Sequence, residues 1–343
     1  MQEIFPHNGI LITPMRILSL FVVIAVACGF GYAGILYAQT FEIPNPFSIV
    51  ISPQVPDAGE EFLVEATTPT VDERALRFEW TINGVVRPDL SGIGKTKIRI
   101  TAGTVGSTTR VGVRALKSSA LFAEASRMIP VANLSLDWTA DTYVPPWYRG
   151  KALPVPGSIA TIIATPEVIL DGHRIAPENL LYRWTLDDQE FTNGVGERTL
   201  AIQTKPYTAD SYRIEVVVED ISKRIRKEKK IFIITANPTG AIYYVSPLGG
   251  IEPRRALSLF SPSRSSVFDF QFEPFFFRIK SRSELSYRWS LGPYAITGAP
   301  QNPYFVTINT ERREPGALPV AISVDDSTII TPSVEKQFTL TIP

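Results

Sequence analysis

Alternating hydrophobic and polar positions dominate the chain after Ala38 and predict β-strands. The alternation is clearest in three segments, with apolar side chains at Val111/Val113/Ala115, Ile214/Val216/Val218 and Val320/Ile322/Val324. Such a period of two is typical of a strand with one buried face. Short strands separated by Pro, Gly, Asn and Asp, with no helical period sustained over three turns, predict antiparallel β-sandwiches.

Three short stretches repeat one pattern, Leu-x-aromatic-x-Trp-Ser/Thr-aliphatic. They read LRFEWTI at 76–82, LLYRWTL at 180–186 and LSYRWSL at 285–291. Their tryptophans, Trp80, Trp184 and Trp289, are separated by 104 and 105 residues. A match at two nearly equal intervals indicates tandem copies of one unit. We expect each tryptophan to lie on a central strand and to pack between the two sheets of its sandwich.

The repeat predicts three domains of about 100 residues, the usual size of an immunoglobulin-like domain. Subtracting the period from the end of the chain places the boundaries at 39–133, 134–237 and 238–343. The fold class is therefore all-β, with three tandem antiparallel β-sandwiches after one N-terminal transmembrane or signal helix. Domains of this size bury a core without disulfides.

An uncharged run of 22 residues at 17–38 precedes the predicted sandwiches. As a helix it would span the hydrocarbon core of a bilayer, which is about 30 Å thick. Arg16 lies before the run, and no Lys or Arg follows until Arg74, so residues 1–16 are predicted to be a cytoplasmic tail. The length of the run favours a membrane anchor, and a cleaved signal peptide ending near Ala38 is the alternative.

Composition excludes several classes of function. The chain has 34 basic and 34 acidic residues, so no basic surface predicts nucleic-acid binding. One cysteine, Cys28, and two histidines, His7 and His173, leave little material for disulfides, zinc ligation or histidine catalysis. There is no G-x-S-x-G, H-E-x-x-H or P-loop motif. We therefore expect no enzymatic activity, no catalytic or metal-binding residues, no cofactor and no small-molecule substrate.

The repeated tryptophan motif, followed by an alternating strand that ends in acidic residues, resembles the PKD and related immunoglobulin-like domains of bacterial cell-surface proteins. In that family a Gly-Asp-Gly turn follows the tryptophan strand, whereas this chain has Asn83-Gly84, Asp187-Asp188 and Gly292-Pro293. The resemblance covers residues 40–343 as a pattern. It implies an extracellular spacer, adhesion or assembly role without enzymatic activity.

Aromatic residues, among them Trp147 and Tyr148, gather early in the second repeat, and Trp147 has no counterpart in the third repeat, where Glu252 occupies the matching place. Exposed aromatic rings bind sugars or form hot spots of protein interfaces. The alternative is packing at a junction between domains. Trp147 and Tyr148 are therefore candidate partner contacts, and Trp138, which has Tyr243 at its matching position, is expected to be a regular strand residue.

The third repeat contains a run of three phenylalanines, Phe275, Phe276 and Phe277. On a continuous strand at least one of these rings would point away from the core. An exposed apolar strand favours partner-strand addition or assembly, and the alternative is burial under the preceding 20-residue loop. The three rings are further candidate partner contacts.

Two charged features have plainer interpretations. Six of the nine residues at 222–230 are basic, which suits either an anionic envelope polymer or a solvated hairpin. The acidic strand ends Glu219-Asp220 and Asp325-Asp326 lack the close spacing of a calcium loop, and the first repeat has Arg114-Ala115-Leu116 there, so solvated turn residues are the plainer interpretation.

Together these features predict a non-enzymatic, membrane-anchored or secreted surface protein. Its tandem modules would act as spacer, adhesion or protein-interaction units outside the cytoplasm. The predicted partners are the membrane, through residues 17–38, and a protein or envelope polymer. The alternative is a structural subunit of an envelope assembly such as a pilus, a secretion system or a surface layer.

Overall fold

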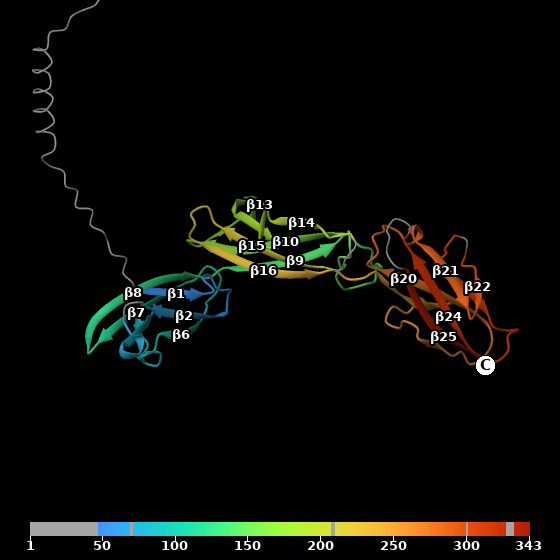
Figure 1. Ribbon diagram of the computed structural model, residues 1–343, viewed down its shortest axis with the longest axis horizontal. Coiled ribbons are helices and arrows are strands. Elements are labelled where there is room, and N and C mark those ends of the chain that lie inside the picture. The colour runs from blue at the N-terminus through green and yellow to red at the C-terminus, as the bar shows by residue number, and fades with distance from the viewer. Residues whose placement is uncertain (1–46, 69–70, 207–209, 300, 327–332) are drawn as a thin grey trace, which may run out of the picture. The chain divides into compact units, whose positions relative to one another are not determined.

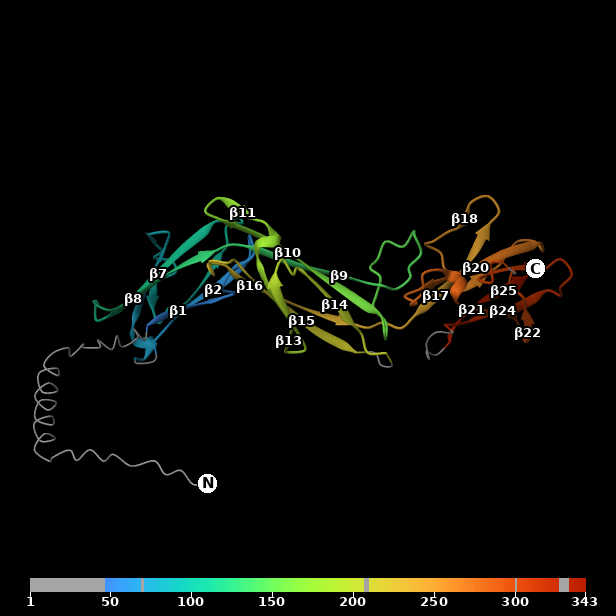
Figure 2. The same cartoon turned by 90° about the horizontal axis from the view of Figure 1, so that it is seen from above.

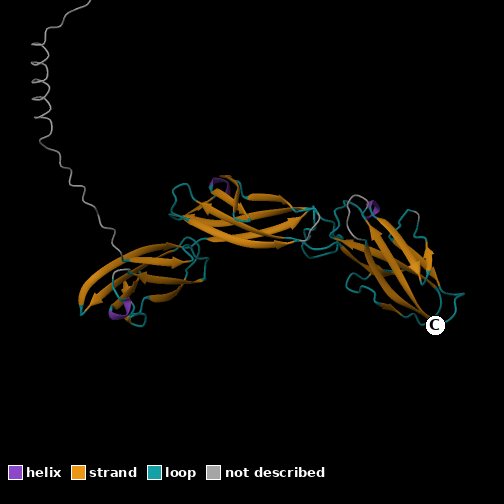
Figure 3. Cartoon of the chain, viewed as in Figure 1, coloured by secondary structure: helices purple, strands orange, loops and turns teal. Residues whose placement is uncertain are grey.

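A computed structural model describes residues 47–68, 71–206, 210–299, 301–326 and 333–343, which belong to one compact unit, Phe47–Pro343. The described residues form β-sheets that are antiparallel except at one short edge strand, and three short 3-10 turns, and Figure 3 shows the predominance of strands. The sheets occur in pairs, and each pair encloses one of three clusters of buried apolar side chains. We call these the first, second and third sheet pairs. The predicted tail and the 17–38 segment lie outside the described residues.

The first sheet pair lies between residues 48 and 130. One sheet has the order β1-β2-β6, and the other has the order β4-β3-β7-β8 with β5 also on β3. The strands are β1 (Ser48–Ser52), β2 (Glu61–Thr67), β3 (Arg77–Ile82), β4 (Val85–Val86), β5 (Gly92–Ile93), β6 (Lys97–Thr101), β7 (Thr108–Lys117) and β8 (Ala120–Pro130). Strands from both sheets contribute to the buried cluster that contains Trp80. The two sheets therefore pack face to face, as a sandwich requires.

The second sheet pair lies between residues 133 and 234. Its sheets have the orders β11-β10-β14, with β9 also on β10, and β13-β12-β15-β16 (Figure 1). The strands are β9 (Asn133–Ala140), β10 (Ile159–Leu170), β11 (His173–Ile175), β12 (Leu181–Leu186), β13 (Gln189–Val195), β14 (Thr199–Gln203), β15 (Ser211–Glu219) and β16 (Arg226–Ile234). Trp184 belongs to the cluster between these sheets.

The third sheet pair lies between residues 239 and 342. Its sheets have the orders β18-β17-β20-β23 and β19-β25-β24-β21-β22 (Figure 2). The strands are β17 (Thr239–Ser246), β18 (Gly250–Ile251), β19 (Leu259–Phe260), β20 (Val267–Phe275), β21 (Ser286–Leu291), β22 (Tyr294–Ile296), β23 (Phe305–Asn309), β24 (Gly316–Asp325) and β25 (Val334–Ile342). Strand β19 pairs in parallel with β25 and so covers its edge.

The three sheet pairs repeat one local arrangement around their tryptophans. A 3-10 turn precedes each tryptophan strand, at Glu73–Ala75, Pro177–Asn179 and Arg282–Glu284. Each indole Nε1 donates to a backbone carbonyl, of Lys95 (2.8 Å), Glu197 (2.7 Å) and Pro303 (3.0 Å) respectively. The hydrogen bond satisfies the one polar atom of a buried indole. The sequence repeat is therefore a repeat of hydrogen bonding as well as of apolar packing.

Candidate functional site

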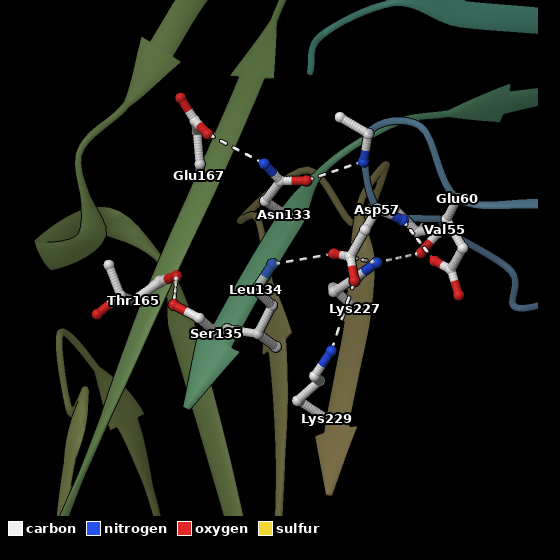
Figure 4. A network of polar contacts seen from close by, with 11 residues as sticks. Val55, Asp57, Glu60, Asn133, Leu134, Ser135, Thr165, Glu167, Lys227 and Lys229 are labelled. Atoms are coloured by element: carbon white, nitrogen blue, oxygen red, sulfur yellow. Dashed lines mark hydrogen bonds and ion pairs between the residues drawn. The ribbon is translucent and has the colours of Figure 1, made fainter. Parts of the chain in front are cut away.

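A buried lysine of the second sheet pair contacts the connection between β1 and β2 of the first. Lys227, the second residue of β16, is 6% exposed. Its ammonium donates to the carbonyl of Val55 at 2.6 Å and lies 2.9 Å from Oδ1 of Asp57 (Figure 4). A buried ammonium is costly unless its donors are satisfied. Lys227 meets this condition only because Val55 and Asp57 are in place.

The backbone near Asn133 completes the network seen in Figure 4. Leu134 donates its N–H to Oδ1 of Asp57 at 3.3 Å, and Ala58 donates its N–H to Oδ1 of Asn133 at 2.9 Å. The amide nitrogen of Asn133 donates to Glu167 at 3.2 Å. These bonds connect the turn at 55–58 to β9, β10 and β16. We call this network the polar junction.

The electrostatics of the polar junction favour an ionised Asp57. Burial acts to raise the pKa of the Asp57 carboxyl, but the hydrogen bond and charge of Lys227, the charge of Lys229 and the Leu134 N–H together hold this pKa below its usual value. The Asp57 carboxylate thus stays charged at neutral pH. An apolar contact accompanies it, because Val55 is 6% exposed and belongs to the buried cluster of the second sheet pair.

A second junction is built from aromatic rings instead of charges. Tyr143 donates its N–H to the carbonyl of Phe277, and its own carbonyl accepts from the N–H of Phe276, both at 2.7 Å. Its side chain packs against the cluster of the third sheet pair. Because Tyr143 follows β9, the loop after that strand of the second sheet pair is bonded to the third.

Trp147 and Tyr148 lie in the same loop and stack on rings of the third sheet pair. Trp147 makes edge contacts with Tyr243 and Phe275, both with ring centroids 5.8 Å apart. Tyr148 makes edge contacts with Phe275 at 5.5 Å and with Phe276 at 5.9 Å. We call this group, together with Tyr143, the aromatic junction. Trp147 and Tyr148 thus have the surroundings expected of the alternative interpretation, packing at a junction between domains.

The phenylalanine run departs from the exposed strand face that the sequence suggested. Phe276 and Phe277 are 7% and 2% exposed, and Phe275 is half-buried against Trp147 and Tyr148. The reason is local: β20 ends at Phe275, and Phe276 has a φ of +65°. The left-handed conformation turns the chain out of the strand. The expected cover by the preceding loop is found instead at Phe260, whose ring packs on Phe268 and Phe270.

The three repeat tryptophans lie at matching positions in the three clusters. Trp80, Trp184 and Trp289 are 0%, 0% and 2% exposed. In the strand registers they lie opposite Val113, Val216 and Ile322 respectively. Each side chain therefore fills the centre of its own sheet pair and is not available to a partner.

The basic run at 222–230 is not a free cationic surface. Arg224 pairs with Asp171 and Arg226 with Glu219, while Lys230 lies 3.3 Å from Glu215. Lys227 and Lys229 both contact Asp57. Five of the six basic residues are therefore engaged with carboxylates of the chain, Lys227 and Lys229 sharing one, while Lys223 is exposed.

The polar junction was not predicted from the sequence, although a signal for it exists. In β16 the odd-numbered residues face inward, and this face carries Lys227, Lys229, Ile231 and Ile233. A lysine at an inward position of an alternating strand needs an acidic or carbonyl partner. The partner itself, Asp57, is distant in the sequence and carries no motif.

A metal-binding cluster and a membrane-spanning helix are both absent from the described residues. No group of three or more His, Cys, Asp or Glu side chains in them is placed to hold a metal ion. Among the same residues there is no helix with the length and hydrophobicity needed to cross a membrane.

Comparison with family models and with curated proteins finds no match. Similar solved structures include the central fibronectin-III array of RIM-binding protein, with 13% identity over 87% of this chain and 97% of that chain and a TM-score of 0.32. The FN1–FN3 domains of chicken CNTN1 have 10% identity over 87% and 98% of the two chains, with a TM-score of 0.23. The fibronectin(III)-like modules of Clostridium thermocellum CbhA have 12% identity over 55% and 94%, with a TM-score of 0.25.

These structures are tandem fibronectin-III arrays, and immunoglobulin-like arrays such as Sidekick-1 domains 1–4 also match. All of the TM-scores are below 0.5, so the fold is taken from the sheets of this chain alone.

Proposed function

We propose that the chain is a non-enzymatic surface protein whose tandem immunoglobulin-like modules act as a spacer and interaction unit. Residues 17–38 would anchor it in a membrane, with residues 39–343 outside the cytoplasm, or would be cleaved as a signal to release a secreted protein. Its partner would be a protein or an envelope polymer that binds the modules.

One observation carries the spacer proposal: hydrogen bonds within the chain connect the first sheet pair to the second and the second to the third. At the polar junction Lys227 bonds Val55 and Asp57, and at the aromatic junction Tyr143 bonds Phe276 and Phe277. Linkers without such contacts behave as flexible coils. Contacts of this kind limit bending between neighbouring sheet pairs. A protein that displays a distant module needs this stiffness.

The assembly-subunit alternative has lost its main support. It was based on an exposed phenylalanine surface at Phe275–Phe277, and these rings are covered by Trp147 and Tyr148 or buried. Edge strand β25 is also covered, by the parallel strand β19. The spacer therefore accounts for these features better than a self-polymerising subunit does.

Sedimentation velocity on residues 39–343 tests this choice, since this segment contains all three buried clusters. We expect a monomer at every concentration. A concentration-dependent association that Phe275→Ser abolishes would support the assembly subunit instead. Circular dichroism of the variant controls for its folding, because Phe275 is only half-buried and tolerates replacement better than Phe277.

Mass spectrometry of the mature protein separates the two forms of the proposal. An intact N-terminus would support the membrane anchor. A chain that starts at Gln39 would show that the segment is a cleaved signal and that the protein is released.

A further inference from the structure

One row of residues at an end of the first sheet pair is unusually apolar. The register places Ile93 on β5 opposite Arg77 on β3, Arg77 opposite Leu116 on β7, and Leu116 opposite Leu121 on β8. Directly opposite residues point to the same face of a sheet. Ile93 is 72% exposed and Leu121 is 51% exposed. We call Ile93, Leu116 and Leu121 the apolar row.

Phe122 and two lysines lie beside the apolar row. Phe122 is 39% exposed, next to a register shift between β7 and β8. Lys95 and Lys117 are exposed, and within the described part of the chain neither takes part in an ion pair. The nearby acidic residues Asp72 and Glu73 instead accept hydrogen bonds from backbone N–H groups of their own loop. The surface thus combines three apolar side chains, with the exposed Arg77 between Ile93 and Leu116, and two exposed lysines at its border.

The other two sheet pairs have acidic residues where the apolar row has leucine. Leu116 lies opposite Arg77, three residues before Trp80, and the matching residues on β15 and β24 are Glu219 and Asp325. In the second sheet pair Glu219 forms an ion pair with Arg226, which takes the place of Leu121. The apolar row is therefore a departure from the repeat and not a feature of the fold.

The position of the apolar row in the fold indicates what it faces. The matching end of the second sheet pair carries Arg226 and Lys227, and Lys227 contacts the first sheet pair. In the first sheet pair β2 ends at Thr67, opposite Ser48, and the chain then crosses to Arg77, opposite Leu116. The apolar row and the start of β1 are therefore at the same end of the first sheet pair.

We propose that the apolar row contacts the surface of the lipid bilayer in which residues 17–38 are anchored. The inference depends on the proposed membrane anchor. Only residues 39–46 separate that segment from Phe47, and eight residues span at most about 28 Å. Exposed Leu, Ile and Phe side chains enter the headgroup region, and lysines are attracted to anionic lipids. Acidic residues like those of the other sheet pairs would be repelled there.

The test uses the full chain with Cys28→Ser and one new cysteine that carries the fluorophore NBD. The cysteine is placed by Leu121→Cys or, as a matched control, by Val195→Cys. Val195 lies opposite Leu181 in the second sheet pair, as Ile93 lies opposite Arg77, and is 58% exposed. The proteins are reconstituted in phosphatidylcholine vesicles with and without phosphatidylglycerol. Flotation measures their association with the vesicles, and headgroup-proximal doxyl lipids are then used to quench the NBD fluorescence.

We expect all variants to float with the vesicles. NBD at residue 121 should be quenched severalfold more than NBD at residue 195, and phosphatidylglycerol should increase the difference. The pair Leu116→Glu and Leu121→Arg, which copies Glu219 and Arg226, should abolish the quenching of NBD at Ile93→Cys without loss of folding by circular dichroism.

Two other results would overturn the inference in distinguishable ways. Proteins that float but show equal or no quenching at residues 121 and 195 retain the anchor and exclude the lipid contact. If the proteins fail to float, the membrane anchor is excluded, and the lipid contact of the apolar row is excluded together with it.

Discussion

The polar junction and the aromatic junction connect neighbouring sheet pairs by different means. The first depends on a few hydrogen bonds and charges, centred on Asp57 and Lys227. The second depends on two backbone hydrogen bonds of Tyr143 and on ring contacts of Trp147 and Tyr148. At both junctions a side chain of one sheet pair packs against the buried cluster of the next. This side chain is Val55 at the polar junction and Tyr143 at the aromatic junction.

The contrast between the polar and aromatic junctions shows that copies of one repeated module can be joined by different kinds of interaction. A polar contact fails when a single partner is lost, because the buried partner stays unsatisfied. An aromatic contact loses strength in proportion to the ring area removed, and it is insensitive to pH. Four predictions test whether the two junctions differ in this way.

The largest effect is expected from Trp184→Ala, which removes the centre of the sheet pair that both junctions share. Loss of a buried tryptophan from a core costs about 3–5 kcal/mol. Differential scanning calorimetry of residues 39–343 should show a strongly lowered melting temperature, with Trp147→Ala as the control. A melting temperature within one degree or so of the native value would show that the second cluster does not depend on Trp184.

The next effect is expected from Lys227→Met, which keeps the length of the side chain but removes its ammonium. The Val55 carbonyl and the Asp57 carboxylate lose their donor, at a cost of about 2 kcal/mol. Lys230→Met is the matched control, because Lys230 is on the same strand and its side chain is 51% exposed. Urea unfolding measures both variants, and equal stabilities would remove the special role of the polar junction.

A smaller effect is expected from Trp147→Ala at the aromatic junction. The variant loses two edge contacts, with Tyr243 and Phe275, each of which contributes about 0.5 kcal/mol, the lower end of the usual range, because Trp147 and Phe275 are only half-buried. Because no buried polar group is left without a partner, the loss should be the same at pH 5 and pH 8. A loss that depends on pH would contradict the division between polar and aromatic junctions.

The smallest effect is expected from acidification of the polar junction. The pKa of Asp57 is lower in the folded chain than in the unfolded chain, so its stabilisation is present above the unfolded value, about 3.9, and disappears as the pH falls through the folded value. Stability of the native chain should therefore fall below about pH 4 more than stability of Asp57→Asn. If the free energy of unfolding falls equally with pH in the two proteins, the titration of Asp57 does not contribute to the pH dependence of stability.

Much of the fold could be predicted because it follows from patterns that repeat along the chain. The spacing of Trp80, Trp184 and Trp289 identified matching core positions, and alternation identified the strands opposite them. Strands β9 and β17 begin at Asn133 and Thr239, next to the predicted boundaries. Local patterns succeed here because burial of one strand face is a local property of the sequence.

The junctions could not be predicted because they depend on residues that are far apart in the chain or on a single backbone angle. Nothing in the sequence near Asp57 indicates a partner on β16. The sequence does not predict the positive φ of Phe276 either, because neither glycine nor asparagine occupies this turn position. The sequence repeat places Leu116 near the acidic strand ends of the other repeats, but only the register shows that Ile93 and Leu121 lie in the same row.

A distance between two spin labels shows most directly whether the polar junction holds the first and second sheet pairs together. Residues 39–343 contain no cysteine, so Met128→Cys and Phe191→Cys, both at exposed sites, place one label on each sheet pair. Double electron–electron resonance should give one narrow distribution in this protein and a broad one after Lys227→Met and Asp57→Asn are added. A broad distribution before those substitutions, or a narrow one after them, would contradict the account.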